Sequence, residues 1–578
     1  MSGWWRNRAG YARVGLDGEE DASARDAASS PPLSRAEKAE ASAALGGFFG
    51  EGVAQLRLAL PVSLSMICNR VMSLTSVAFV GHLGSLPLAG AALATTLGNV
   101  TGNSVMVGMA SACSTLGGQA FGAERYSELG RVTQRALVIL TLAACPIALS
   151  WSAAEPALLA LGQDPAIARA SATYLETLIP GLFFYAWNVV LQAYMQSQGI
   201  TKPGAVAGVV AALLHVPANV AFIRGAGLGF AGAGLATSWS NGVVLSINAG
   251  YLAFAHQRTP FFTPHAHKTW DGWSAEAALT EWGPFLRLAL PGILMMAEWW
   301  ASEANILIAG WLPDPELNVA AVSIFQVTNA LAFMIPVGFS VAVLTRASNE
   351  LGAGRGARAR HASGVAHAMV LGVEVLVSAA ILSARRRWAS LYTDDERVVR
   401  SVARLLVPLA VYTAFDGVLC VASGVIKACG KQWVAGPVVF LAYYVVGIPA
   451  ACWLAFEKGR GAVGLAVGAT VGTTIHSVII VCVVLGLDWR KEAARASARG
   501  GARDAKGGAD GEWEGAEERR GGDEERALVK KESPRASPPA SDETVAEVEL
   551  AAVGGEGNDE TRTKTKTSGS DVDCRSRA

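Results

Sequence analysis

The sequence has 578 residues, of which 51 % are hydrophobic and 17 % are charged, with a mean hydropathy of +0.33 and a formal net charge of zero. A chain this apolar is excluded from the soluble globular class and is predicted to be a polytopic membrane protein that contacts the lipid bilayer. Seven of its eight cysteines lie in apolar runs without CxxC spacing, so we expect neither a disulfide framework nor a metal site.

Residues 1–52 are polar and mixed in charge, and they predict a disordered cytoplasmic N-terminus without a recognisable signal peptide. Twelve apolar runs follow, six on each side of the polar stretch 256–282, which is predicted to be a cytoplasmic inter-lobe linker. The runs lie at about 53–80, 86–117, 131–151, 166–197, 204–223, 230–255, 284–311, 318–349, 363–384, 398–427, 434–456 and 462–487.

Two halves of the sequence resemble each other at a fixed offset of 230 residues. The hexapeptide LRLALP occurs at 56–61 and again at 286–291. At the same offset Gly122-Ala123 meets Gly352-Ala353, and Gly234-Leu235-Ala236 meets Gly464-Leu465-Ala466. We therefore predict an all-α protein of two homologous six-helix lobes, residues 53–255 and 283–487, arranged as in an alternating-access transporter. The placement of Lys and Arg favours cytoplasmic termini, with an arginine cluster at 385–404 as the exception.

The run 284–311 is predicted to be one membrane-spanning helix that carries two acids, Glu298 and Glu303. A carboxylate at the centre of a membrane helix costs roughly 2.5–3.5 kcal/mol, so these side chains should face a wet cavity rather than lipid. The alternative is that both glutamates only pair with other helices. Pro291 precedes the acids and should bend the helix as a hinge.

Other charged residues inside apolar runs are weighed in the same way. Asp416 stands alone at the centre of its run and is the strongest further candidate, whereas Glu374 lies in a short run that could slide it toward the interface. Arg70 either pairs with an acid across the cavity or snorkels along a tilted helix. His215 and His476 are interpreted as packing residues.

The repeat offset separates the chemistry of the two lobes. Glu298, Glu303 and Asp416 correspond to Cys68, Ser73 and Ala186, none of which is acidic. We therefore expect the proton- or cation-binding groups to lie in the C-terminal lobe.

Six segments make the sequence similar to eukaryotic, plant-like members of the MATE (multidrug and toxic compound extrusion) family over about residues 53–487. They are GHLG at 81–84, GQAFGA at 118–123, EWWASE at 298–303, IPVGFSVAVLTRASNELGAG at 335–354, SGVIKACGKQ at 423–432 and YYVVGIP at 443–449. The resemblance implies twelve helices in two bundles around a central cavity, and export of organic cations, xenobiotics or other organic solutes in exchange for H⁺ or Na⁺.

The resemblance also implies that Glu298, Glu303 and Asp416 bind the coupling ion or the solute. Animal members of the family carry a glutamate where this chain has Gln326, and another where it has Asp416. Arg70 has no counterpart in the family pattern. Further residues that could line the cavity are Trp299, Trp300, Tyr443 and Glu374.

A proton-coupled exporter of small organic solutes is the leading functional hypothesis, with H⁺ favoured over Na⁺ as the coupling ion. The alternatives are a Na⁺-coupled exporter and a lipid-linked precursor flippase of related fold, for which a strongly cationic cavity would be expected. Enzyme motifs such as HExxH and GxSxG do not occur, so we expect no catalytic residues and no cofactor. We expect a monomer in the plasma or vacuolar membrane, without a nucleic-acid partner.

Residues 488–578 fall outside the resemblance. The 36 charged residues among positions 491–578 make a folded core improbable, so a disordered cytoplasmic tail is predicted. Its deletion should leave transport by each folded molecule nearly unchanged.

Overall fold

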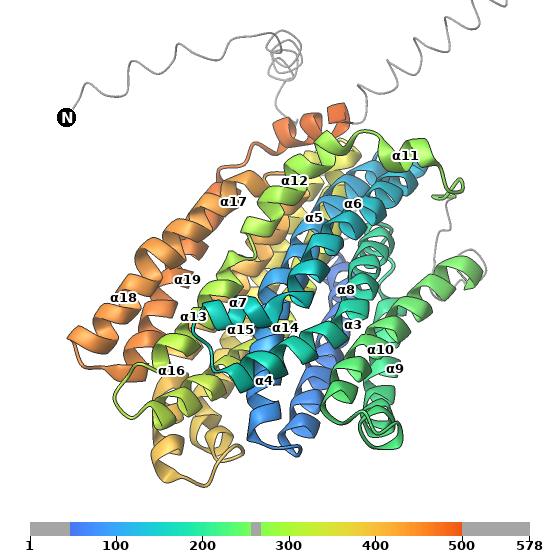
Figure 1. Ribbon diagram of the computed structural model, residues 1–578. Helices are drawn as coiled ribbons and strands as arrows, with labels where there is room; N and C mark the ends of the chain where they lie inside the picture. Colours follow the sequence, from blue (N-terminus) through green and yellow to red (C-terminus); the bar gives the residue numbers. More distant parts are fainter. Residues whose placement is uncertain (1–46, 256–267, 500–578) are drawn as a thin grey trace, which may run out of the picture. The chain divides into compact units, whose positions relative to one another are not determined.

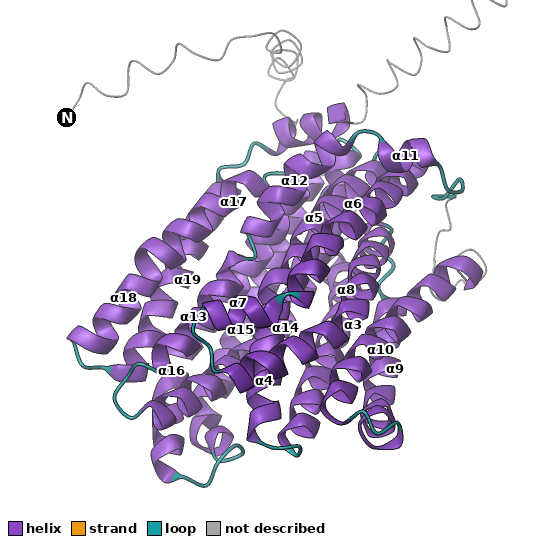
Figure 2. Ribbon diagram, viewed as in Figure 1, coloured by secondary structure: helices purple, strands orange, loops and turns teal. Residues whose placement is uncertain are grey.

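The computed structural model describes residues 47–255 and 268–499, and every regular element within these ranges is a helix (Figures 1 and 2). The apolar runs of the sequence fold as helices because hydrocarbon offers no hydrogen-bond partner to the backbone, which must bond within its own segment. Short turns separate them, and glycine with positive φ at Gly84, Gly199 and Gly430 permits the tight reversals between successive helices.

The half before the linker begins with a 35-residue helix and contains three π-helical segments, η1 to η3. Its elements are α3 (Gly47–Gly81), α4 (Ser85–Gly98), η1 (Asn99–Asn103), α5 (Ser104–Gly122), α6 (Tyr126–Ser152), α7 (Ala154–Ala160), α8 (Pro165–Ser197), α9 (Lys202–Val220), η2 (Ala221–Gly225), α10 (Gly229–Gly250) and η3 (Tyr251–Ala255).

The half after the linker begins with a broken helix, α12 and α13. Its elements, with the short linker helix α11, are α11 (Ala275–Leu279), α12 (Trp282–Leu294), α13 (Ala297–Ala309), α14 (Pro315–Gly352), α15 (Gly356–Ala389), α16 (Glu396–Ala428), α17 (Gln432–Val439), η4 (Phe440–Gly447), α18 (Ile448–Cys452), η5 (Trp453–Glu457) and α19 (Gly461–Leu485).

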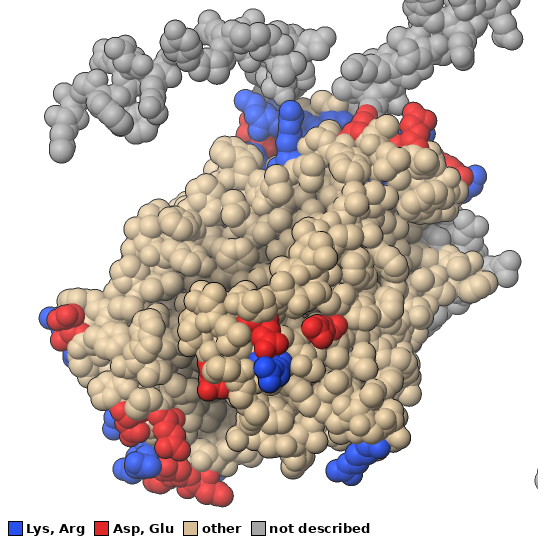
Figure 3. Space-filling view, viewed as in Figure 1, with Lys and Arg blue, Asp and Glu red and all other residues tan. Residues whose placement is uncertain are grey.

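Nine helical stretches in the described part of the chain are long and apolar enough to cross a membrane. The other three of the twelve predicted spans are helical as well. Residues 86–117 lie in α4, η1 and α5, residues 230–255 in α10 and η3, and residues 284–311 in α12 and α13. Figure 3 shows a broad band across the upper part of the visible face that is free of Lys, Arg, Asp and Glu, with charges at the top, along the lower edge and in one small group near the middle of the face. Such a band suits contact with lipid.

Close contacts between the halves repeat at the offset found in the sequence. A Cβ placed on Gly122 of α5 would meet Asn349 of α14, and one placed on Gly352 of α14 would meet Gln119 of α5. Because 119 + 230 = 349 and 122 + 230 = 352, these are the same contact made twice, with the roles of the halves exchanged. The internal repeat is therefore a pseudo-two-fold relation between the halves, whereas the exact lobe boundaries stay a prediction.

The halves are tied together at the end of the bundle where α3 begins and α5, α14 and α16 end, the predicted cytoplasmic end. Glu51 of α3 accepts two hydrogen bonds from Arg346 of α14, at 2.7 and 3.1 Å. Gln119 donates to the Ala428 carbonyl at 2.8 Å, and Thr115 donates to the Lys427 carbonyl at 2.8 Å. Each of these bonds joins a helix of one half to a helix of the other.

Two predicted disordered segments are partly ordered. Residues 47–52, assigned to a disordered N-terminus, begin α3, and the Glu51 side chain is fully buried against Arg346. Residues 489–499, assigned to a disordered tail, form a helix that buries Trp489, Ala493 and Ala496 on one face. High charge concealed this helix in the sequence because its Lys and Arg residues lie mainly on the opposite, exposed face. The remaining tail and residues 1–46 and 256–267 lie outside the described residues.

Candidate functional site

The predicted spanning helix 284–311 is not continuous, which corrects the prediction of a single helix. It turns at Met295 and Met296, about one helical turn after Pro291. The two pieces pack on different neighbours: α12 lies against α5 of the first half, whereas α13 lies against α14, α19 and η4 of the second. Pro291 cannot donate a backbone hydrogen bond, which weakens the helix just before the turn. Because of the break, the direction of α12 does not fix the direction in which the acidic side chains of α13 point.

Glu298 is held by hydrogen bonds from the second half of the chain. The Tyr443 hydroxyl of η4 donates to Glu298 Oε1 at 2.6 Å, and Tyr443 also bonds the Thr473 hydroxyl of α19 at 3.1 Å. His476 of α19 lies with Nδ1 3.6 Å from Glu298 Oε2. A carboxyl group in this setting has one strong, oriented hydrogen bond and an imidazole beside it, so it is positioned rather than free to move.

Asp416 lies next to Glu298 and Glu374 lies near Asp416, and both of these carboxyl groups are almost completely buried. Asp416 of α16 is 4 % exposed and its carboxyl group interacts directly with that of Glu298. Glu374 of α15 is 1 % exposed and packs on Gly417 of α16, so closely that a Cβ there would lie 2.9 Å from Glu374 Oε1. We call Glu298, Asp416 and Glu374 the carboxyl cluster.

Glu374 is the member of the carboxyl cluster that is buried without a hydrogen-bond partner in the described part of the chain. Its side chain lies between α15 and α16 and is almost fully shielded, whereas its depth in the membrane stays a prediction. Neither of its carboxyl oxygens has a hydrogen-bond partner among the described residues. A buried, unpartnered carboxyl group is costly, which makes a structural role alone a poor explanation for it.

Glu303 faces away from the carboxyl cluster, toward the first half. Thr96 of α4 donates to Glu303 Oε2 at 3.5 Å, and Arg70 of α3 interacts with Glu303 electrostatically. The offset of five residues on a helix predicts such a divergence, because Glu303 lies about 140° around α13 from Glu298. Of the two alternatives for Arg70, the structure favours interaction with an acid of the opposite half.

A small cavity lies beside the carboxyl cluster, between α13, α14, α16 and α19. Its polar lining comes from Ser302, Asn305, Gln326 and Tyr412, and its remaining lining is apolar. Gln326 donates to the Ser302 carbonyl at 2.8 Å, which fixes the amide in the wall. The cavity has a volume of about 20 Å³, which is enough for about one water molecule.

The two tryptophans next to Glu298 take different positions. Trp299 packs edge-on against Phe333 of α14, with ring centroids 6.3 Å apart, and remains 43 % exposed. Trp300 donates from its indole nitrogen to the Ser104 hydroxyl of α5 at 3.1 Å, so it connects α13 to the first half.

The two membrane histidines, His215 and His476, have different surroundings. His215 bonds Ser76 at 2.9 Å and Ser240 at 2.7 Å inside the first half, which confirms a packing role. His476, interpreted as a packing residue too, is buried against Tyr443 and lies beside Glu298, so its packing role stays a prediction.

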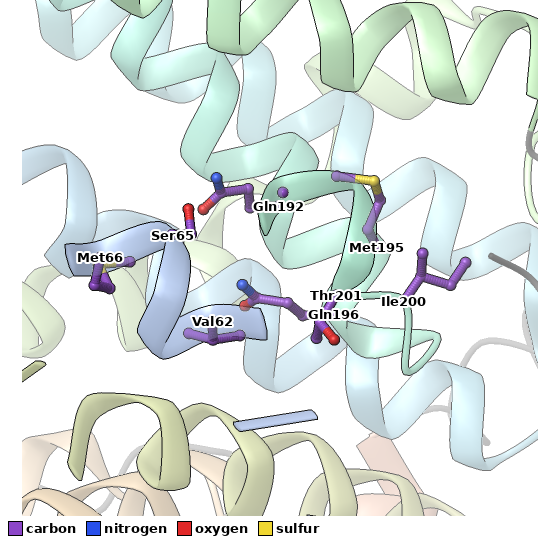
Figure 4. Close-up of a pocket in the computed structure, with 9 residues that line it drawn as sticks. Val62, Ser65, Met66, Gln192, Met195, Gln196, Ile200 and Thr201 are labelled. Carbon is purple, nitrogen blue, oxygen red and sulfur yellow. The ribbon is translucent and has the colours of Figure 1, made fainter. Parts of the chain in front are cut away.

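A second cavity, in the first half, shows the contrast between the halves. It lies between α3, α8 and the start of α9, and Figure 4 shows Val62, Ser65 and Met66 on one side and Gln192, Met195 and Gln196 on the other. Its lining contains hydroxyl and amide groups but no carboxyl group. The acidic chemistry is therefore concentrated in the second half, in agreement with the residues found by the repeat offset.

The sequence also matches the MatE family model over residues 61–221 and 292–453, two blocks that coincide with the two halves. The chain belongs to the MATE family. Among curated proteins it is 37 % identical to DETOXIFICATION 16 of Arabidopsis thaliana over 444 residues, which cover 76 % of this chain and 88 % of that protein. It is 33 % identical to multidrug and toxin extrusion protein 1 of Danio rerio, covering 78 % of this chain and 75 % of that protein.

A solved structure agrees with the sequence comparison. The crystal structure of the eukaryotic MATE transporter AtDTX14 superposes with a TM-score of 0.73 at 31 % identity, covering 78 % of this chain and 99 % of that one. The likeness confirms the predicted fold class, twelve transmembrane helices in two homologous six-helix lobes. This MATE protein is therefore a multi-pass integral membrane transporter, and its relatives are transporters rather than enzymes.

Proposed function

We propose that this MATE protein exports small organic cations in exchange for protons, and that the carboxyl cluster is where the two compete. The observation that carries the proposal is the direct interaction between the carboxyl groups of Glu298 and Asp416, with Glu374 near Asp416. Carboxyl groups this close to one another can share a proton or jointly attract a cation. A site that binds either a proton or a cation, but not both at once, couples the transport of the proton and the cation in opposite directions.

The surroundings of the carboxyl cluster support a cationic solute. Tyr443 donates a hydrogen bond to Glu298, and Tyr412 lies close enough to Glu298 and Asp416 to interact with them electrostatically. Aromatic faces attract organic cations, while the buried acids supply the opposite charge. The same charges argue against the lipid-linked precursor flippase, because a phosphate-bearing solute would be repelled by three carboxyl groups.

The asymmetry of the halves supports a single exchange site in the second half. Cys68 and Ala186 occupy the positions that correspond to Glu298 and Asp416, so the first half has no matching acids at those points. The wall that the first half contributes would then enclose the solute without competing for protons.

Transport in proteoliposomes tests the function directly. The purified full chain is reconstituted, and uptake of benzyltrimethylammonium is followed with an imposed pH gradient, an imposed Na⁺ gradient, or neither. We expect uptake driven by the pH gradient and accompanied by proton movement in the opposite direction. Uptake that follows only the Na⁺ gradient would overturn proton coupling, and an absence of gradient-driven uptake across a panel of organic cations would overturn cation export.

The proposal includes a setting in the cell. The protein would act as a monomer in the plasma or vacuolar membrane with both termini in the cytoplasm, so that solute leaves the cytoplasm in either case. Protease protection of tags placed at the two termini in sealed vesicles tests this orientation.

A further inference from the structure

Arg70 is a charged side chain that cation export does not require. It lies on α3 of the first half, inside a membrane-spanning helix, where a cationic side chain is expensive and usually functional. A positive charge facing the site of a cationic solute would oppose binding rather than help it. The residue therefore calls for a separate explanation.

The contacts of Arg70 leave its hydrogen-bonding capacity unused. Its Nε is shielded from solvent and has no hydrogen-bond partner among the described residues. Its charged neighbour, Glu303, is close enough to interact with it across the boundary between the halves, but the two form no direct ion pair within the described part of the chain. A guanidinium group has five N–H donors in a planar fork that fits a carboxylate.

The carboxylate of Glu303 also has hydrogen-bonding capacity that the described residues do not fill. Its one hydrogen bond from a described residue is the long bond from Thr96, 3.5 Å between the oxygens. One guanidinium and one carboxylate thus lie within electrostatic range of each other across the interface between the halves, and each has hydrogen-bonding capacity to spare. A pair that served only to neutralise its own charges would be expected to close into a bidentate ion pair, as Glu51 and Arg346 do elsewhere in this chain.

We infer that Arg70 and Glu303 form a binding site for the zwitterionic group of a solute, with the solute carboxylate on Arg70 and its ammonium group on Glu303. This inference deepens the proposed function, on which it rests, by adding zwitterions to the solutes transported. A site with one charge of each sign matches a ligand with one charge of each sign. A phosphate group, with up to two negative charges, would gain less because Glu303 repels it.

The proposed site is formed by residues of both halves. Arg70 and Thr96 come from the first half, and Glu303 comes from α13, the segment that follows the break at Met295 and Met296. Any tilt of one half against the other changes the separation of Arg70 and Glu303. A zwitterion that bridges them therefore binds most tightly at one separation, which makes its affinity depend on the conformation.

Three matched probes distinguish this site from general cation binding. Benzyltrimethylammonium carries only a cation, 4-carboxybenzyltrimethylammonium adds a carboxylate to the same frame, and benzoate carries only the anion. Binding of each to the purified full chain is measured by calorimetry for wild type, Arg70→Gln, Arg70→Lys and Glu303→Gln. Thermal unfolding of each variant shows whether it is folded.

We expect opposite changes for the two cationic probes in Arg70→Gln. Affinity for the zwitterion should fall at least tenfold, because its carboxylate loses the guanidinium, whereas affinity for benzyltrimethylammonium should rise severalfold because a repelling charge is gone. Arg70→Lys should keep part of the zwitterion affinity, since it retains the charge but not the planar fork. Glu303→Gln should strengthen benzoate binding by releasing Arg70 from its acidic neighbour.

Parallel losses for both cationic probes in a folded Arg70→Gln protein would overturn the inference and reduce Arg70 to a structural counter-charge for Glu303. So would equal affinity of wild type and Arg70→Gln for the zwitterion. These outcomes are separate from failure of the proposed function, which appears as absent proton-driven uptake in wild-type proteoliposomes whatever the binding measurements give.

Discussion

The predicted cytoplasmic end of the bundle and the carboxyl cluster each contain a buried glutamate, Glu51 and Glu374, and the hydrogen-bonding capacity of these two carboxyl groups is satisfied to very different degrees. At the end of the bundle Glu51 has two hydrogen bonds from one arginine, and Gln119 and Thr115 each reach a backbone carbonyl of the other half. In the carboxyl cluster Glu374 has no hydrogen-bond partner among the described residues. Satisfied groups stabilise one arrangement, whereas unsatisfied ones retain capacity for a ligand or a proton.

The largest expected effect comes from Glu298→Gln in the carboxyl cluster. Proton-driven uptake in proteoliposomes should fall at least 100-fold, while the melting temperature stays the same or rises, because the substitution removes a buried charge. Cys68→Ser, at the corresponding position of the first half, is the matched control and should keep most of the uptake. Wild-type uptake in Glu298→Gln would leave that residue with a structural role and erase the contrast between the two regions.

Asp416 tests whether the carboxyl cluster exchanges protons for cations. In wild type, affinity for benzyltrimethylammonium should increase as the pH rises, since loss of a proton leaves a negative charge for the cation. Asp416→Asn cannot make this change, so its binding should be weaker by about tenfold and nearly independent of pH. Asp416→Glu should retain part of both properties. A pH profile like that of wild type in Asp416→Asn would contradict the proposed role.

At the predicted cytoplasmic end, Glu51→Ala should affect stability. It leaves the Arg346 guanidinium, which is 25 % exposed, without its bidentate partner, and we expect a loss of about 3 kcal/mol in the free energy of unfolding. The matched control is Glu155→Ala, which breaks an ion pair whose arginine is 76 % exposed and should cost less than about 1 kcal/mol. Equal changes of the melting temperature in the two variants would show that the buried pair does not hold the halves together.

Two truncations give the smallest expected effects and separate the last helix from the rest of the tail. Removal of residues 489–578 exposes the surface covered by Trp489, Ala493 and Ala496 and breaks the 2.8 Å bond from Lys431 to Glu492, which should cost about 2–3 kcal/mol. Removal of residues 500–578 should change stability by less than about 0.5 kcal/mol and leave transport intact. Similar melting temperatures for the two truncated proteins would mean that the helix contributes no packing energy.

Sequence reasoning was most successful where a single physical rule determined the structure. Long apolar runs give membrane helices, so the helical character of all twelve spans could be predicted. The offset of 230 residues anticipated the reciprocal contacts of Gly122 and Gly352. The angular offset on one helix likewise anticipated that Glu298 and Glu303 would face different neighbours.

Features that depend on a distant partner could not be predicted. Glu51 looks like a surface residue of a polar terminus until Arg346, 295 positions away, is placed against it. His476 has no local signal of its contact with Glu298, and the helix at 489–499 is recognisable only by the surface on which it lies. In each case the structure depends on packing between distant segments, which local sequence preferences do not reveal.

The reciprocal contacts of Gly122 and Gly352 have a mechanical consequence. Each glycine lies against the main chain of the opposite helix, and no side chain of its own fills the crossing. Two backbones this close leave no room for a Cβ, so α5 and α14 touch at a point that even a small side chain would force apart. The crossing can thus serve as a pivot between the two halves, on their pseudo-two-fold axis. A methyl group added at either glycine would separate α5 from α14 and hinder the movement of both halves equally.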